Sequence, residues 1–280
     1  MMKKKVWFVT GASKGLGLTL VKKLLKEGYS VAATSRSVND LKEAVGSDTK
    51  AFLPLAMNLL DENDVQKAIE KTVEHFGSID VVVNNAGYGL VGGLEELSDA
   101  EARKNFDVNV FGSLNVIRKA LPHLRRQKSG HIYNIASIGG FTGSYPGFGI
   151  YCATKFAVHG FTEALVEEVR PFGIKVTVVS PGYFRTNFLD SSLAVPAKPI
   201  DDYKSVREMQ SLHQAGINGK QQGDPEKAAS VLIRVAEGNE AVVHLFLGED
   251  AYGLAEQKIK TVQQDMASVR ELATSTNFEG

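Results

Sequence analysis

The sequence predicts an α/β fold in which a doubly wound parallel sheet of about seven strands carries helices on both faces. Short apolar runs alternate along the chain with segments of helical periodicity, as repeated strand and helix units require. One run, Val81–Val83, is β-branched and apolar throughout, which is typical of a strand buried on both faces. We expect a single domain over residues 1–280, with a short lid insertion at about 187–223 and a C-terminal helix at about 250–273.

Composition and charge exclude several kinds of partner. The chain has 280 residues, 43% of them hydrophobic, which is enough to bury one large core. Lys+Arg and Asp+Glu both number 32, so no net field attracts nucleic acid or an acidic membrane surface. The single cysteine, Cys152, cannot form an internal disulfide, the six histidines show no metal-like spacing, and no signal or membrane-spanning run is evident. We therefore expect a cytoplasmic protein that holds no metal and binds a small molecule.

The first strand and helix are joined by a glycine-rich turn. The apolar run Val6–Val9 ends in Thr10-Gly11-Ala-Ser-Lys14-Gly15-Leu-Gly17, and apolar residues then recur at helical spacing from Leu18. Glycines let the backbone approach a pyrophosphate, and the first turn of a helix offers unpaired N–H groups and the positive end of its dipole. The turn therefore predicts a dinucleotide site, although ordinary loops also collect glycines.

The second strand, Ser30–Thr34, ends where dinucleotide-binding units place the residue that contacts the adenosine ribose. An acidic residue there would bind the 2′-hydroxyl of NAD. The sequence instead has Ser35-Arg36, and Arg36, helped by Lys14, suits the 2′-phosphate of NADP through charge-assisted hydrogen bonds. An arginine that caps a surface loop is the alternative. The absent acid and the present base together favour NADP over NAD.

Later segments continue the alternation of strands and helices. Further strands are expected at Ala51–Ala56, Val81–Val83, His131–Ala136, Ile174–Val179 and Ala241–Leu247. Helices are expected around Val65–Phe76, from Asp99 past Leu121, from Tyr151 onward and from Asp224-Pro225, where an N-cap precedes a proline. Ligands of open parallel sheets bind outside the carboxyl ends of the strands, so residues that follow strands are the candidates for a site.

The stretch 137–155 concentrates the reactive side chains. Ser137 follows the fifth strand, and Tyr151 and Lys155 are one turn apart on one face of the helix that Tyr151 is expected to open. A nearby ammonium lowers the pKa of a phenol, which makes the phenol a better acid and base near neutral pH. The spacing alone is weak evidence, because it is common on solvated helices. Cys152 is expected on a different face of this helix and is interpreted as packing.

Together these motifs resemble those of the short-chain dehydrogenases/reductases, over about residues 5–190. The resemblance is carried by the glycine turn at 10–17, Asn84-Asn85-Ala86-Gly87, Asn109, Ser137 and Tyr151-x-x-x-Lys155. It implies a Rossmann-type fold, a nicotinamide cofactor and a homo-dimer or homo-tetramer, and it is nearest to the carbonyl reductase and hydroxysteroid dehydrogenase branch. Asn58 departs from the family, which usually has an aspartate against the adenine.

The resemblance also implies a role for each matched residue. Ser137 would hydrogen-bond the substrate carbonyl oxygen, Tyr151 would donate its proton as hydride reaches the carbon, and Lys155 would hold the nicotinamide ribose. Asn109 would distort its helix and hold a water that passes protons to Lys155. The residues expected to contact the cofactor are Gly11, Ser13, Lys14, Gly15, Leu16, Gly17, Ser35, Arg36, Asn58, Leu59, Asn85, Ala86, Gly87, Tyr151, Lys155, Pro181, Gly182 and Thr186.

These expectations describe an NADPH-dependent carbonyl reductase or alcohol dehydrogenase acting on a hydrophobic ketone or secondary alcohol. Substrate pockets are mostly apolar. The candidate pocket residues are Phe141, Tyr145, Phe148, Tyr183, Phe184, Phe188 and Leu189. The alternatives are a non-catalytic NADP-binding regulatory protein, an NAD-linked hydroxysteroid or retinol dehydrogenase, and an NAD-linked sugar epimerase or dehydratase.

Overall fold

Seven parallel strands form the central layer of the described chain, which is residues 4–278 of a computed structural model. Their order across the sheet is β3-β2-β1-β4-β6-β7-β9, and every neighbouring pair is parallel. The order reverses between β1 and β4, where ligands bind in such sheets. The predicted doubly wound sheet is confirmed. The strands are β1 (Val6–Val9), β2 (Ser30–Ser35), β3 (Phe52–Ala56), β4 (Val81–Asn84), β6 (Gly130–Ile135), β7 (Ile174–Pro181) and β9 (His244–Leu247).

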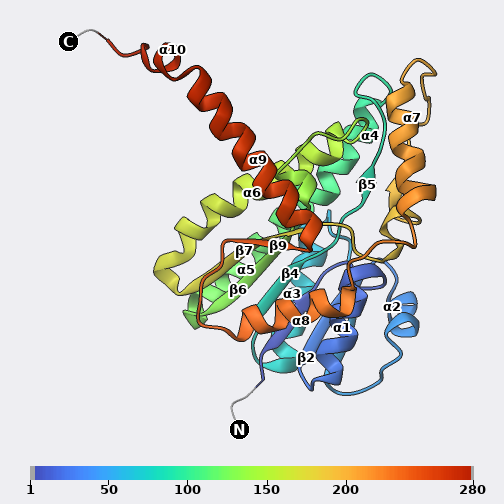
Figure 1. Ribbon diagram of the computed structural model, residues 1–280. Helices are drawn as coiled ribbons and strands as arrows, with labels where there is room; N and C mark the ends of the chain where they lie inside the picture. The colour runs from blue at the N-terminus through green and yellow to red at the C-terminus, as the bar shows by residue number, and fades with distance from the viewer. Residues whose placement is uncertain (1–3, 279–280) are drawn as a thin grey trace.

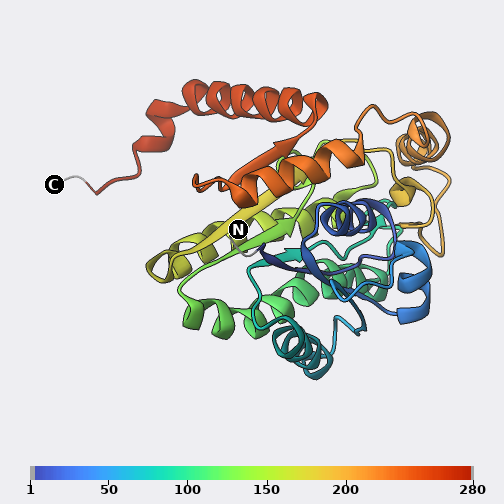
Figure 2. The ribbon, with the colours of Figure 1, turned by 90° about the horizontal axis from the view of Figure 1, so that it is seen from below.

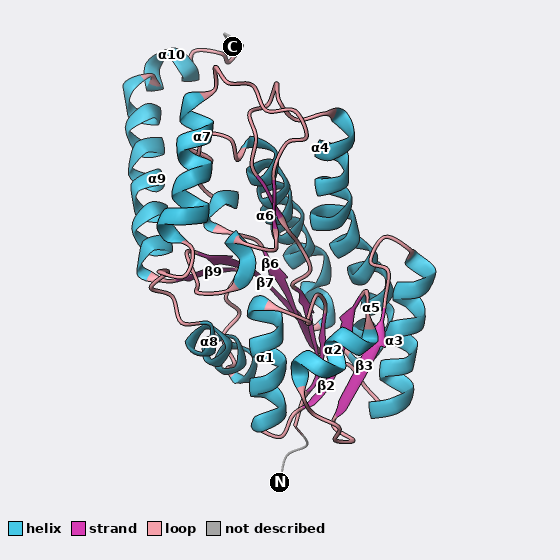
Figure 3. Ribbon diagram, turned by 90° about the vertical axis from the view of Figure 1, so that its right-hand side faces the viewer, coloured by secondary structure: helices cyan, strands magenta, loops and turns pink. Residues whose placement is uncertain are grey.

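Two layers of helices enclose the sheet (Figure 1). One layer consists of α1 (Gly15–Lys26), α2 (Val38–Val45) and α8 (Pro225–Glu237). The other consists of α3 (Glu62–Phe76), α5 (Gly112–Gln127) and α6 (Gly149–Val169). Figure 3 shows the strands passing between the two layers. The sequence did not predict α2, because only Leu41 and Val45 of this short helix are buried.

Alternate side chains of β1 divide the core between the two layers. Trp7 and Val9 pack with α1 and α8, whereas Phe8 packs with the opposite layer. Trp7 is fully buried, and its ring stacks on that of Tyr133 in β6 at a centroid separation of 6.3 Å. Because the central strands are buried on both faces, the edge formed by their carboxyl ends is held rigidly from both sides.

The helix predicted from Asp99 is divided into three segments. α4 (Asp99–Phe106) begins with a capping box between Ser98 and Glu101, and a π-helical turn, Asp107–Phe111, joins it to α5. A π turn adds a residue to the helix and is frequently found at functional sites. Asn109 lies in this turn, so the structure contains the local distortion that the resemblance implies at this residue.

The insertion after β7 is folded against the body of the protein. Its elements are the 3₁₀ turn Asn187–Leu189, β8 (Leu193–Ala194), α7 (Lys204–Ser211) and the π-helical turn Leu212–Ile217. β8 pairs in parallel with β5 (Gly89–Leu90). Arg207 of α7 pairs with the fully buried carboxylate of Glu96 at 2.6 Å. Burial raises the pKa of Glu96, but hydrogen bonds from the Ile200 and Gly93 amides, together with Arg207, outweigh this effect and lower the pKa overall. The ionised carboxylate therefore anchors the insertion.

The C-terminal helix leaves the body of the protein (Figures 1 and 2). α9 (Glu249–Ser268) buries Ala251 and Ala255 near its beginning and then extends outward, followed by α10 (Arg270–Thr274). The remaining 3₁₀ turns are Ile138–Gly140 and Arg170–Phe172. In the described part of the chain, no helix has the length and apolar character needed to cross a membrane.

Candidate active site

A cavity of about 710 Å³ lies at the carboxyl ends of the strands. It is lined by segments that follow β1, β2, β3, β4, β6 and β7, together with residues of the insertion. With one exception, every residue predicted to contact the cofactor lines this cavity, and so do Ser137, Tyr151 and Lys155. The exception is Gly17, which faces the side chain of Asn85 and the backbone carbonyl of Gly11. A Cβ atom at Gly17 would collide with both groups, so the absence of a side chain here allows the close packing of the turn against Asn85.

The glycine turn has the geometry of an anion site. Gly11 and Gly15 have φ angles of +64° and +60°, which residues with a Cβ atom rarely adopt. Lys14 is the N-cap of α1, and its side chain makes no capping hydrogen bond. The first N–H groups of α1 therefore face the cavity without a side-chain acceptor, as the phosphate groups of a dinucleotide require. These residues fit the predicted dinucleotide.

Asn85 and Thr10 tie the turn to the neighbouring strand. The Asn85 side-chain amide donates to the carbonyl oxygens of Thr10 and Gly11, both at 2.9 Å. The Thr10 hydroxyl accepts hydrogen bonds from the backbone N–H groups of Asn85 and Ala86 at 3.0 and 3.1 Å. One strand further, Asn84 donates to the side-chain oxygen of Asn134 at 2.8 Å and links β4 to β6. The tetrapeptide therefore positions the walls of the cavity.

The basic residues predicted at the ribose end take different positions. Arg36 is exposed at the end of β2, lines the cavity, and has no ion pair within the described residues. Lys14 instead reaches the insertion, where its ammonium donates to the carbonyl and hydroxyl oxygens of Ser191 at 3.3 and 3.2 Å. The side-chain oxygen of Asn58 accepts from the N–H of Leu60 at 3.1 Å. Lys14 is thus held by the insertion, whereas Arg36 is exposed at the cavity.

Tyr151 and Lys155 are buried together near the start of α6. The Ser137 hydroxyl opposes the rise in the pKa of the Tyr151 phenol, and its oxygen accepts from the N–H of Gly139 at 3.1 Å. The ammonium of Lys155 lies 5.8 Å from the centroid of the Tyr151 ring and donates to the carbonyl oxygen of Ile135 at 2.9 Å. α6 begins at Gly149 rather than at Tyr151, but the pair still shares one helix face.

The net lowering of the Tyr151 pKa that was expected from the nearby Lys155 is not found in this structure. Burial raises the pKa of Tyr151, and the hydrogen bond from Ser137 only partly opposes this effect. Burial also lowers the pKa of Lys155 to about 8. Both shifts have one cause, because a site shielded from water penalises the phenolate and the ammonium alike. Tyr151 therefore retains its proton at neutral pH.

Asn109 lies behind the cavity and does not line it. Its side-chain oxygen accepts from the N–H of Tyr88, and its amide donates to the carbonyl of Tyr88, both at 3.0 Å. The same amide donates to the hydroxyl of Thr154 on α6 at 3.1 Å. A Cβ atom at Gly87 would approach the Asn109 oxygen at 3.0 Å. Asn109 thus holds the loop after β4 against α6, and the proton relay stays a prediction.

The apolar part of the cavity partly matches the predicted pocket. Tyr145, Phe148, Tyr183, Phe184, Phe188 and Leu189 line it. Phe141 does not belong to the lining, because its ring packs on that of Phe246 at a centroid separation of 5.2 Å. Cys152 was expected on a different helix face from Tyr151, but it lines the cavity. It packs with Phe148 and Tyr151. Burial raises the pKa of its thiol to about 11, so Cys152 contributes apolar surface.

His213 is a cavity residue that sequence reasoning missed. Its Nδ1 donates to the carbonyl of Met209 at 2.8 Å, so its Nε2 accepts from the hydroxyl of Tyr183 at 2.9 Å. Burial lowers the pKa of His213 and keeps the ring neutral. Only the π-helical turn Leu212–Ile217 brings this ring to the cavity, and the sequence of an irregular insertion contains no signal for that turn.

Comparison with known proteins agrees with this geometry. Residues 5–195 match the family model described as short chain dehydrogenase. The chain belongs to the short-chain dehydrogenase/reductase family. Like other members, this short-chain dehydrogenase is an NAD(P)-dependent oxidoreductase built on a Rossmann-type sheet.

Three similar proteins illustrate the relationship. Oxidoreductase BOA17 of Botryotinia fuckeliana is 36% identical over 97% of this chain and 99% of its own length. A 3-ketodihydrosphingosine reductase of Bacteroides thetaiotaomicron is 38% identical over 84% of each chain. The crystal structure of a short-chain dehydrogenase from Streptomyces avermitilis superposes with a TM-score of 0.89 at 32% identity, covering 98% of this chain and 100% of that one. The similarity to BOA17 and to the Streptomyces structure thus includes the C-terminal part of this short-chain dehydrogenase.

The burial of Lys155 predicts a pH-dependent stability. Its pKa is about 8 in the folded chain against an ordinary value of 10.5, so the unfolded chain binds more protons between these pH values. Stability should therefore rise with pH in this window. Relative to Lys155→Met, which cannot titrate, the wild type should gain about 2 kcal/mol of unfolding free energy between pH ~7.5 and pH ~10.

Urea denaturation of both proteins at the two pH values measures this difference. Lys71→Met, on the exposed side of α3, is the matched control for losing a lysine. We compare the unfolding free energy of the wild type minus that of Lys155→Met at the two pH values. If this difference stays constant or falls as the pH rises, the ammonium is not held in a low-dielectric site.

Proposed function

We propose that the protein is an NADPH-dependent carbonyl reductase, also able to act as an alcohol dehydrogenase, for a hydrophobic ketone or secondary alcohol. The observation that carries this proposal is that Ser137 and Tyr151 lie together in the lining of the cavity, with Lys155 one helical turn further along α6. A hydroxyl and a phenol side by side offer two hydrogen bonds to one oxygen atom, as reduction of a carbonyl requires.

The side chains suggest how the proton moves. Ser137 binds the substrate oxygen and stabilises the charge that develops on it. Tyr151 is kept protonated by burial, so it donates its proton to that oxygen during reduction and accepts it back during oxidation. Lys155, held by the carbonyl of Ile135, provides positive charge behind the phenol and stabilises the phenolate that remains. The nicotinamide, when bound, supplies or accepts the hydride.

The walls of the cavity support a hydrophobic substrate. The cluster around Tyr151 consists of Val91, Phe148, Cys152 and Leu193, with Tyr145, Phe188 and Met209 packed against it. These side chains exclude water from the proton-transfer site and bind apolar carbon. The similarity to a protein named 3-ketodihydrosphingosine reductase also favours a ketone that carries a long apolar group. We therefore propose a ketone flanked by aliphatic or aromatic carbon as the substrate class.

The choice of NADPH rests on Arg36. Its guanidinium is exposed at the cavity end of β2, and the position carries no carboxylate that would bind a ribose 2′-hydroxyl and repel a phosphate. Lys14 is occupied by Ser191, so Arg36 rather than Lys14 is proposed to bind the 2′-phosphate. The sequence suggested that Lys14 helps Arg36 in this contact, whereas we propose that Arg36 makes it without Lys14.

Removal of the phenol hydroxyl should separate cofactor binding from catalysis. Tyr151→Phe keeps the ring packed in its cluster but loses the donated proton, so kcat for ketone reduction should fall about 10³-fold while NADPH still binds. Stopped-flow absorbance and NADPH fluorescence titration measure the two effects. Tyr252→Phe, on the exposed side of α9, is the matched control. Near-normal turnover in Tyr151→Phe would refute the proposed mechanism.

Removal of the ribose-end cation should change cofactor preference. Arg36→Ala should raise KM for NADPH roughly tenfold to a hundredfold, which is the loss expected for charge-assisted hydrogen bonds, and should change KM for NADH little. Initial rates with each cofactor measure the ratio. Arg170→Ala removes an arginine that pairs with Glu167 at the far end of α6, and it serves as the control. Equal effects on NADPH and NADH would refute the assignment.

A further inference from the structure

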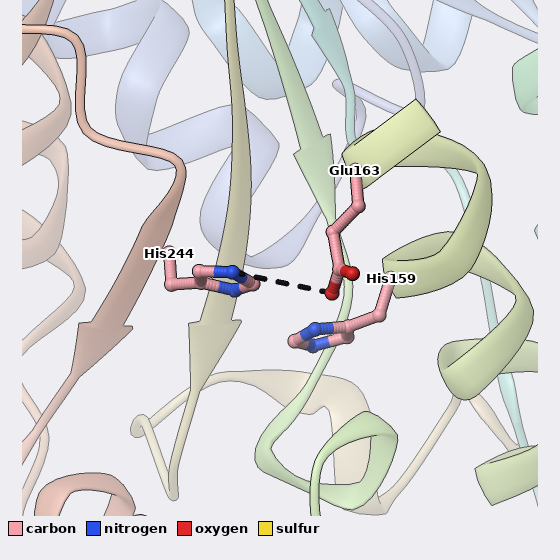
Figure 4. Close-up of side chains that lie close together, drawn as sticks. All are labelled: His159, Glu163 and His244. Atoms are coloured by element: carbon pink, nitrogen blue, oxygen red, sulfur yellow. Dashed lines mark ion pairs between the residues drawn. The ribbon is translucent and has the colours of Figure 1, made fainter. Parts of the chain in front are cut away.

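Two histidines and a glutamate come together on the side of α6 that faces β9 (Figure 4). His159 and Glu163 are four residues apart on α6, and His244 begins β9. One ligand atom from each side chain lies within 4.8 Å of the other two, and no second group of this kind occurs in residues 4–278. The expectation of no metal rested on spacing along the chain, which does not reveal a group formed by a helix and a distant strand.

The buried member of the group is oriented as a ligand. His159 is 5% exposed, and its Nε2 lies 2.9 Å from the hydroxyl of Ser180. A hydrogen bond at one ring nitrogen fixes the tautomer and directs the other nitrogen outward, as metal-binding histidines require.

The two exposed members can close around an ion. Nε2 of His244 lies 3.9 Å from the carboxylate of Glu163, and the two side chains are 40% and 56% exposed. Ligand atoms around a tetrahedral zinc ion are about 3.3 Å apart. A small rotation of two solvent-facing side chains is therefore sufficient, while the backbone and His159 remain in place. The fourth position is open to water.

We propose that His159, Glu163 and His244 bind a divalent transition-metal ion, with Zn²⁺ as the best fit to two imidazoles and one carboxylate. This site lies outside the cavity of the proposed reaction. It joins the edge strand β9, directly before α9, to the helix that carries Tyr151 and Lys155. Its role is to fasten this edge of the sheet to α6.

The test uses the full chain after treatment with a chelator. Titration with Co²⁺ should give one equivalent and the intense visible absorption of a tetrahedral centre, which Zn²⁺ then abolishes by displacement. His244→Ala and Glu163→Gln should each weaken Co²⁺ binding at least tenfold, and both sites are exposed, so folding is retained. Zn²⁺ should raise the melting temperature of the wild type but not that of His244→Ala.

Matched controls lie close to the site. His75→Ala and Glu167→Gln remove an exposed histidine on α3 and an exposed glutamate one turn further along α6, and both should bind Co²⁺ as the wild type does. Absence of saturable binding, or equal binding by wild type, His244→Ala and Glu163→Gln, would overturn the proposal.

A separate observation concerns the outer half of α9. We define the α9 stripe as the exposed apolar side chains along α9 and at its C-cap, which are Tyr252, Ile259, Val262, Met266 and Val269. With buried Ala255 they follow one another at alternating intervals of three and four residues, the spacing of a two-helix coiled coil. The same face packs on the body at Ala251 and Ala255 and then continues past it, so the body covers only its beginning.

The geometry points to a second copy of this chain as the partner of the α9 stripe. In an antiparallel pair related by a two-fold axis, Val262 faces Ile259 of the partner subunit, and the stripe matches itself. Lys258 then lies opposite Asp265 of the partner subunit, on both sides of the axis, so the flanking charges are complementary. This contact is independent of the proposed activity.

Sedimentation of the full chain tests the contact. Ile259→Asp and Met266→Asp should each halve the mass of the assembly. Gln257→Asp and Gln264→Asp, on the opposite face of α9, should leave the mass unchanged. Lys258→Asp should weaken association, and adding Asp265→Lys should restore it. An unchanged mass in both stripe variants, or a failure of the second charge change to rescue the first, would overturn the proposal.

Discussion

All seven strands of the sheet run in the same direction, and the site depends on this constraint. Their carboxyl ends share one edge, so the loops that follow β1, β4 and β6 meet there although many residues separate them in the chain. The reversal of strand order between β1 and β4 opens this edge into a cavity. Glycines serve two purposes here: Gly17 lies too close to Asn85 for a Cβ atom, and Gly15 has a φ angle of +60° that other residues rarely adopt.

Hydrogen bonds made by two asparagines turn the shared edge into a rigid frame. Asn85 joins the glycine turn to the loop after β4, and Asn109 joins that loop to α6. Asn109 lies in the π turn, and its amide donates to the carbonyl of Tyr88. Tyr151 and Lys155 are buried in this frame, and the exclusion of water raises the pKa of the phenol and lowers that of the ammonium. Burial, more than the attraction between their charges, sets their chemistry.

Much of the fold could be read from the sequence because its signals are local. The fifth predicted strand, His131–Ala136, differs from β6 by one residue at each end. The last predicted strand was less accurate, because Ala241 to Val243 have the same apolar character as β9 but precede it. α2 and the short pair of β5 and β8 were missed, because a brief element buries too few residues to show periodicity.

The sequence by itself determined the glycine turn, the positions of Ser137, Tyr151 and Lys155, and Arg36 at the end of its strand. Each of these follows from chemistry within a few neighbouring residues. The tertiary structure decided what depends on distant contacts: Cys152 faces the cavity, Phe141 packs on Phe246, and His213 enters through the insertion. It also reversed the pKa shift expected for Tyr151 and brought His244 to α6. Burial and proximity are properties of the packed chain, and spacing along the sequence does not contain them.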